Sequence, residues 1–154
     1  MSNPISIKVA AIQLEPIRHD VQATHLKAEG YIQAAVADGA ELIVLPELFN
    51  TGYIPNSRIW NDCLNANEST IDWLRKTALK YKVHLGAGLI EYNDGHFSNT
   101  FVMATDTGRL AGRAEKESAE SYIFRRGHGR HVIPTRFGSI GVGICADNHL
   151  THIL

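Results

Sequence analysis

This chain of 154 residues has little cysteine, no apolar run of membrane-spanning length and no strong charge of one sign. Its two cysteines, Cys63 and Cys145, are too few for the disulfide framework of a small secreted domain, so we expect a reducing, cytoplasmic environment. The start of the sequence lacks the basic and apolar segments of a secretory signal. Because no apolar stretch reaches the length that crosses a bilayer, we expect no membrane association.

A charge imbalance is also missing, since 15 basic and 16 acidic residues give a formal net charge of −1. Such a balance provides no field that would attract nucleic acid, and we expect no nucleic-acid partner. The segment 125–131 (Arg-Arg-Gly-His-Gly-Arg-His) is basic, but it is short and has no interleaved aromatic residues. One of its arginines could instead clamp a substrate carboxylate.

Metal and cofactor motifs are incomplete. Two His-x-x-His pairs, at 128–131 and 149–152, have a spacing found in metal sites, but no set of cysteines or carboxylates completes a tetrahedron. We therefore expect no metal. The glycines at 138, 141 and 143 do not have dinucleotide-binding spacing, and no helix-length segment follows them, so no cofactor is expected.

The pattern of apolar residues predicts a single layered α/β domain. Hydrophobic residues make up 44% of the chain, close to the globular average. A helix is predicted from the cap Asp20 to about Asp38, ended by Gly39, and another from Ser69 to Tyr81, after a loop over 52–67 in which a short helix is the alternative. Strands are predicted at 5–14, 41–45, 83–92, 99–105, 109–113, 132–136 and 139–144. Helices alternating with strands, followed by a run of strands, favour an α/β fold.

Cys145 is the first candidate for chemistry. It ends the glycine-rich apolar run 138–145, where a buried strand gives way to the polar segment 146–149. A turn at a strand end exposes a nucleophile while backbone N–H groups converge beside it. A thiol is mostly protonated at neutral pH and needs a nearby base or cation. The alternative is that Cys145 is simply a small buried hydrophobic residue.

Glu47 and Lys116 could supply the base and the cation. Glu47 follows an apolar strand and Pro46, at the edge of a sheet where α/β folds tend to bind ligands. Lys116 could stabilise a thiolate and later an oxyanion, and one of the neighbouring acids, Glu115, Glu117 or Glu120, could fix its ammonium group. Taken singly, each residue is better explained as a solvated side chain in a surface loop.

In their order and spacing, several segments resemble the nitrilase superfamily, the carbon–nitrogen hydrolases that include amidases, carbamoylases and nitrilases. The matching segments are Val9-Ala-Ala-Ile-Gln13, Leu45-Pro-Glu-Leu-Phe49, Asn99-Thr100, the turn Thr107-Gly108, Lys116 and the run 138–147. The resemblance extends from Ile7 to Asn148. It implies a four-layer αββα sandwich and a homo-oligomer.

The resemblance also implies a Glu–Lys–Cys triad, which maps onto Glu47, Lys116 and Cys145. A second glutamate of the family maps best onto Glu120, and the backbone N–H of Ala146 would help to hold the developing negative charge. The implied reaction is hydrolysis of an amide, carbamoyl or nitrile group of a small molecule through a cysteine thioester. The aromatic residues that commonly surround the family lysine are replaced here by Arg113-Ala-Glu-Lys-Glu, which leaves the substrate class open.

Family members continue well beyond the cysteine, whereas only nine residues follow Cys145 here. We therefore expect the N-terminal part only of the sandwich, a hydrolase domain over 5–154 that is incomplete at its C-terminal end. The alternative to an enzyme is a non-catalytic truncated remnant, or a partner-binding half-domain whose triad is inherited rather than used.

Overall fold

Three parallel strands followed by two antiparallel strands form the central sheet. The computed structural model describes residues 6–53, 57–118 and 123–153. The strand order follows the sequence: β1 (Val9–Ala11), β2 (Leu42–Val44), β3 (His84–Asn93), β4 (His96–Ala104) and β5 (Leu110–Glu115). Strands β1 to β3 pair in parallel, and β3 to β5 pair antiparallel. The predicted α/β architecture is confirmed.

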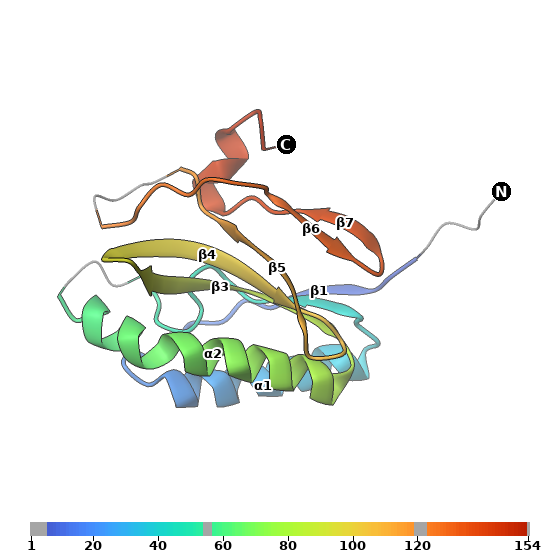
Figure 1. The fold of residues 1–154 in the computed structure, drawn as a ribbon. Helices are drawn as coiled ribbons and strands as arrows, with labels where there is room; N and C mark the ends of the chain where they lie inside the picture. Colours follow the sequence, from blue (N-terminus) through green and yellow to red (C-terminus); the bar gives the residue numbers. More distant parts are fainter. Residues whose placement is uncertain (1–5, 54–56, 119–122, 154) are drawn as a thin grey trace.

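The helices and a second, small sheet lie on opposite faces of the central sheet (Figure 1). Helices α1 (Val21–Ala37) and α2 (Ile59–Tyr81) cover one face. The hairpin of β6 (Val132–Thr135) and β7 (Gly138–Gly141) lies across the other face and leads into the short 3-10 helix η1 (Cys145–His149). The described residues thus form helix, sheet and sheet layers, three of the four expected for an αββα sandwich.

Local signals account for several element boundaries. Asp20 caps α1, because its Oδ1 accepts a hydrogen bond from Ala23 N at 2.8 Å. The helix ends where predicted, with Gly39 at φ 86° just after the cap residue Asp38. The predicted turn between β4 and β5 is present, with Gly108 at φ 75°.

Three boundaries predicted from the sequence are wrong. Helix α2 begins at Ile59, not at Ser69, since burial of Cys63 and ring packing of Trp60 stabilise a first half of weak helix propensity. Strand β1 is a short edge strand with a half-exposed Val9, not a buried strand over 5–14. Strand β7 ends at Gly141, so the chain leaves the hairpin before Cys145.

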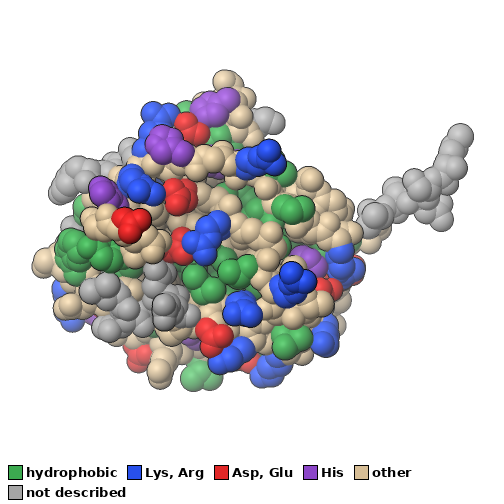
Figure 2. Space-filling view, in the orientation of Figure 1, with side chains coloured by type: hydrophobic (Ala, Val, Ile, Leu, Met, Phe, Trp, Pro, Cys, Tyr) green, Lys and Arg blue, Asp and Glu red, His purple; other side chains and the backbone are tan. Residues whose placement is uncertain are grey.

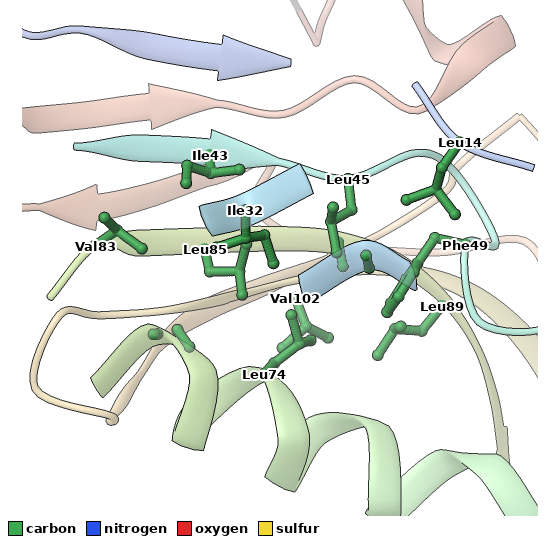
Figure 3. Close-up of a cluster of buried hydrophobic side chains, with 14 of the residues drawn as sticks. Leu14, Ile32, Ile43, Leu45, Phe49, Leu74, Val83, Leu85, Leu89 and Val102 are labelled. Atoms are coloured by element: carbon green, nitrogen blue, oxygen red, sulfur yellow. The ribbon is translucent and has the colours of Figure 1, made fainter. Parts of the chain in front are cut away.

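Apolar side chains fill both spaces beside the central sheet. Between the sheet and the helices, Leu74 of α2 and Ile32 of α1 are fully buried against strand residues such as Leu85 (Figure 3). On the opposite face, Met103 of β4 and Ile133 of β6 belong to a second cluster that joins the two sheets. This second cluster fixes the β6–β7 hairpin, and with it the chain that leads to Cys145.

The surface carries charges of both signs. Figure 2 shows basic and acidic side chains interspersed over the face viewed. In the basic segment 125–131, Arg126 pairs with Glu117 at 2.8 Å, and Arg125 lies 3.9 Å from Glu115. Within the described ranges, no helix is long and apolar enough to span a bilayer.

Candidate active site

Glu47 lies where the chain leaves β2 and crosses over β3. Phe49 N donates to Gly88 O at 3.0 Å, and Gly88 N donates to Pro46 O at 3.2 Å, so the crossing segment is tied to β3 on both sides of Glu47. Leu48 adopts a left-handed conformation, with φ 51°, and both Leu48 and Phe49 are buried. The strained, buried Leu48 and the buried Phe49 directly follow Glu47 and so fix the direction of its carboxylate.

The Glu47 carboxylate accepts hydrogen bonds from two buried side chains. Lys116 Nζ lies 3.0 Å from Glu47 Oε1, and Asn99 Nδ2 donates to the same oxygen at 2.7 Å. Lys116 follows β5 and is held beside β4 by a backbone hydrogen bond from its N to Asn99 O, 2.8 Å long. The Lys116 side chain is 6% exposed and that of Glu47 is 31% exposed. The structure therefore brings together two of the predicted site residues, which are 69 positions apart.

Two of the three acidic neighbours of Lys116 pair with arginines. Glu115 and Glu117 face Arg125 and Arg126, because successive side chains of an extended segment point to opposite sides. Hydrogen bonds from His152 and Arg126 lower the pKa of the Glu117 carboxyl below its usual range. Glu120 lies outside the described residues.

Cys145 sits at a sharp turn between the β6–β7 hairpin and η1. The residue has φ 50°, in the left-handed region that non-glycine residues rarely adopt, and its side chain is exposed. Such strain is typical of a nucleophile held on a tight turn from strand to helix. Ala146 follows within the first turn of η1 and is half-buried.

A cavity of about 280 Å³ between the two sheets connects Cys145 with Glu47. Apart from these two residues its lining is apolar or glycine: Leu42, Val44, Leu45, Gly88, Phe101, Met103, Ile140, Gly141, Val142, Gly143 and Ile144. Glu47 therefore contacts Lys116 and lines the same cavity as Cys145.

The second thiol has a different environment. Cys63 lies on α2 with no exposed surface, and its Sγ contacts Ile90 O at 3.5 Å. Burial, with a smaller contribution from the charge of Glu91, raises the pKa of the Cys63 thiol to about 12. A thiol that stays protonated is a poor nucleophile, so Cys63 serves as an internal reference for Cys145.

Two polar residues of the site were not assigned a role from the sequence. Asn99 donates to Glu47, and Asp147, with no exposed surface, accepts backbone hydrogen bonds from segments on both sides of the site. Both occur in the segments that carried the family resemblance. Nothing in their residue type or spacing revealed these contacts, since each depends on pairing between distant strands.

The histidines of the two His-x-x-His pairs do not form a metal centre. His152 Nε2 lies 2.8 Å from Glu117 Oε2, and His131 Nε2 lies 3.7 Å from the same oxygen. Over the described part of the chain, no group of three or more His, Cys, Asp or Glu side chains is placed to hold a metal ion.

Comparison with known proteins connects this geometry with one family. A sequence model of the carbon–nitrogen hydrolase family matches residues 8–154. Omega-amidase NIT3 of Saccharomyces cerevisiae is 29% identical, over 92% of this chain and 55% of its own length. A nitrilase of Pyrococcus abyssi is 32% identical, over 92% of this chain and 56% of its own length. The chain thus spans little more than half the length of these curated relatives.

Solved structures give the same fold. The crystal structure of Saccharomyces cerevisiae Nit3, a member of the nitrilase superfamily, matches with a TM-score of 0.86 at 28% identity, over 99% of this chain and 60% of that chain. An amidase from Nesterenkonia sp. matches with a TM-score of 0.87 at 19% identity, also over 99% and 60%, and shows the fold alone. The expected nitrilase-like fold is confirmed for the part that this chain covers.

Proposed function

The chain belongs to the carbon–nitrogen hydrolase family, and we propose that it hydrolyses the amide, carbamoyl or nitrile group of a small molecule through Glu47, Lys116 and Cys145. The observation that carries the proposal is the shared Glu47 carboxylate, which lies 3.0 Å from Lys116 Nζ and lines the same cavity as Cys145. An acid–base group, a cation and a thiol are the components that thioester chemistry needs.

In the first half of the proposed reaction, Glu47 takes the thiol proton as Cys145 Sγ attacks the carbonyl carbon of an amide. The negative charge that develops on the oxygen is held by the Lys116 ammonium group and the N–H of Ala146. Glu47 then gives its proton to the departing amine. The products of this half are the free amine and a thioester on Cys145.

In the second half, Glu47 accepts a proton from water, which attacks the thioester carbon. The tetrahedral intermediate collapses, the acid leaves, and the proton returns to the Cys145 sulfur. Lys116 and Asn99 keep the Glu47 carboxylate in one orientation through both halves, because each donates to Oε1. Fixed orientation of the acid–base group is worth orders of magnitude in rate.

The direct test is release of ammonia from a panel of small amides, carbamoyl compounds and nitriles. Replacing Cys145 by Ala is expected to abolish release. Because the chain spans about half of its curated relatives, Cys145 alkylation by iodoacetamide, followed by mass spectrometry, gives a readout that needs no substrate. We expect fast alkylation of Cys145 and slow alkylation of Cys63, and we expect Glu47→Gln to slow the reaction of Cys145.

Glu41→Gln is the matched control, because Glu41 is a surface carboxylate that pairs with Arg136 at 3.1 Å, away from the cavity. It should leave the Cys145 rate constant unchanged. Equal, slow labelling of both cysteines in the wild-type chain would overturn the proposal and favour the partner-binding half-domain. The proposed homo-oligomer is tested separately by sedimentation.

A further inference from the structure

We propose that Asp147 is a positioning residue, whose carboxylate locks the Cys145 turn to the chain segment that carries Lys116; this inference rests on the function proposed above. Its Oδ2 accepts from Ile144 N at 3.2 Å, directly before the nucleophile. Its Oδ1 accepts from Glu117 N at 3.1 Å and from Ser118 N at 2.7 Å, directly after the lysine. One carboxylate thereby joins two backbone segments about 30 positions apart.

The burial of Asp147 makes this connection strong. The residue has no exposed surface, and a buried carboxylate is tolerated only where hydrogen bonds replace its hydration. Three backbone N–H groups do so, and hydrogen bonds to a charged acceptor are about twice as strong as neutral ones. Releasing either segment would leave a charged oxygen buried without its donor.

The bond to Ile144 also supports the strained turn. Ile144 is extended, at φ −102°, and Cys145 turns to φ 50° before the chain enters η1. Asp147 closes this turn with two hydrogen bonds to Ile144, because its own N donates to Ile144 O at 3.0 Å while its side chain accepts from Ile144 N. A side chain that reaches back to the N–H before a helix has the geometry of one half of a capping box.

The Asp147 contacts set the distance between the backbone segments that carry Cys145 and Lys116, in addition to stabilising the fold. Cys145 and Lys116 have no covalent neighbour in common, since Lys116 follows β5 of the central sheet and Cys145 follows the β6–β7 hairpin. The carboxylate sets the spacing of the two backbones at the residues adjacent to both. A shift of about 1 Å in such a spacing can cost a hundredfold in rate, which is why a residue that touches no substrate controls the site.

Asp147→Asn is the test, because the amide has the same shape but only one acceptor oxygen. In either amide orientation, an NH₂ group faces a backbone N–H, so one of the two segments is released. We expect the rate constant for Cys145 alkylation to fall between about tenfold and a hundredfold, and its pH dependence to move toward that of a free cysteine. Cys63 should stay slow, since its labelling reports global unfolding. Glu41→Gln, the surface control defined above, removes a carboxylate charge but no contact with Asp147, and should keep the wild-type rate within about twofold.

Three results would overturn the inference. Unchanged rate and pH dependence for Cys145 would show that the carboxylate does not position it. Faster labelling of both cysteines would show that Asp147 only stabilises the fold, as would failure of both Asp147→Asn and the smaller variant Asp147→Ser to fold. The proposed function fails independently, if Glu47→Gln leaves Cys145 alkylation unchanged in the otherwise wild-type chain.

Discussion

Replacing Gly88 by alanine tests how β3 positions Glu47. A Cβ at Gly88 would lie 2.6 Å from Glu47 Cα, 3.0 Å from Leu48 N and 3.1 Å from Pro46 O, whereas ordinary van der Waals contact begins at 3.4 Å. All three are backbone atoms, so no rotation of a side chain relieves the overlap. The crossing segment must move away from β3, and its two hydrogen bonds to Gly88 must lengthen or break.

The expected loss of stability combines two contributions. Overpacking costs about 1 to 3 kcal/mol, and each broken backbone hydrogen bond adds about 1 kcal/mol. Urea unfolding measures this loss. Because the displaced backbone carries Glu47, iodoacetamide should also alkylate Cys145 more slowly in the Gly88→Ala variant than in wild type, under conditions where both chains are folded.

Gly30→Ala is the matched control for the same chemical change. Gly30 lies within α1, and a Cβ there would have no atom within 4 Å. Alanine is the better helix former by about 1 kcal/mol, so this variant should be more stable than wild type and equally reactive at Cys145. If Gly88→Ala unfolds at the wild-type urea concentration with unchanged Cys145 reactivity, the reasoning about the close crossing is wrong.

Three further predictions concern the core, the pH dependence and the site. Leu74→Ala, which empties a fully buried position, should lower the free energy of unfolding by about 2 to 5 kcal/mol in urea. Burial lowers the pKa of His25 to about 4, so between the unfolded value of 6.5 and 4 this histidine binds a proton only in the unfolded state. Its contribution of about 3 kcal/mol to stability should be lost as pH falls through this range, and the fall should be smaller by that amount in His25→Gln. Asn99→Ala removes the 2.7 Å donor to Glu47 and should slow Cys145 alkylation about tenfold, whereas unchanged alkylation would exclude a role for this contact.

Local sequence patterns predict several element boundaries of the fold. The cap Asp20, the stop at Gly39 and the turn at Gly108 act within a few residues, so their positions follow from side-chain chemistry and from glycine's freedom at positive φ. The family resemblance identified in advance the two residues, Glu47 and Lys116, that the structure joins at 3.0 Å. Separation of 69 positions in the sequence hides that contact from any local reasoning.

The missed features all depend on tertiary contacts. The first half of α2 contains asparagines and an aspartate, which favour loops, yet it is helical because Trp60 packs edge-on against Tyr92 and Phe97 at 5.1 and 4.7 Å. Asp147 looked like one polar residue after a strand. Its role is visible only once two backbone segments have been brought to either side of it.

The ion pair between Lys116 and Glu47 offers a way to separate chemistry from stability. A buried ion pair loses much of its attraction to desolvation, and apolar replacements are often as stable or more stable. The Lys116 side chain is 6% exposed, so Glu47→Gln alone removes a negative charge that lies 3.0 Å from a buried positive charge. Adding Lys116→Met removes the positive charge.

If the pair is kept for catalysis, the double variant should be more stable than Glu47→Gln alone and within about 1 kcal/mol of wild type in urea, although its Cys145 reactivity is lost. Lys116→Met alone is the control for the effect of methionine on stability. In this variant the Glu47 carboxylate keeps its charge and is 31% exposed to water. A double variant less stable than either single variant would mean that the pair is held for the fold. Lys116 would then be a structural residue, and the oxyanion role proposed for it would have to pass to backbone N–H groups alone.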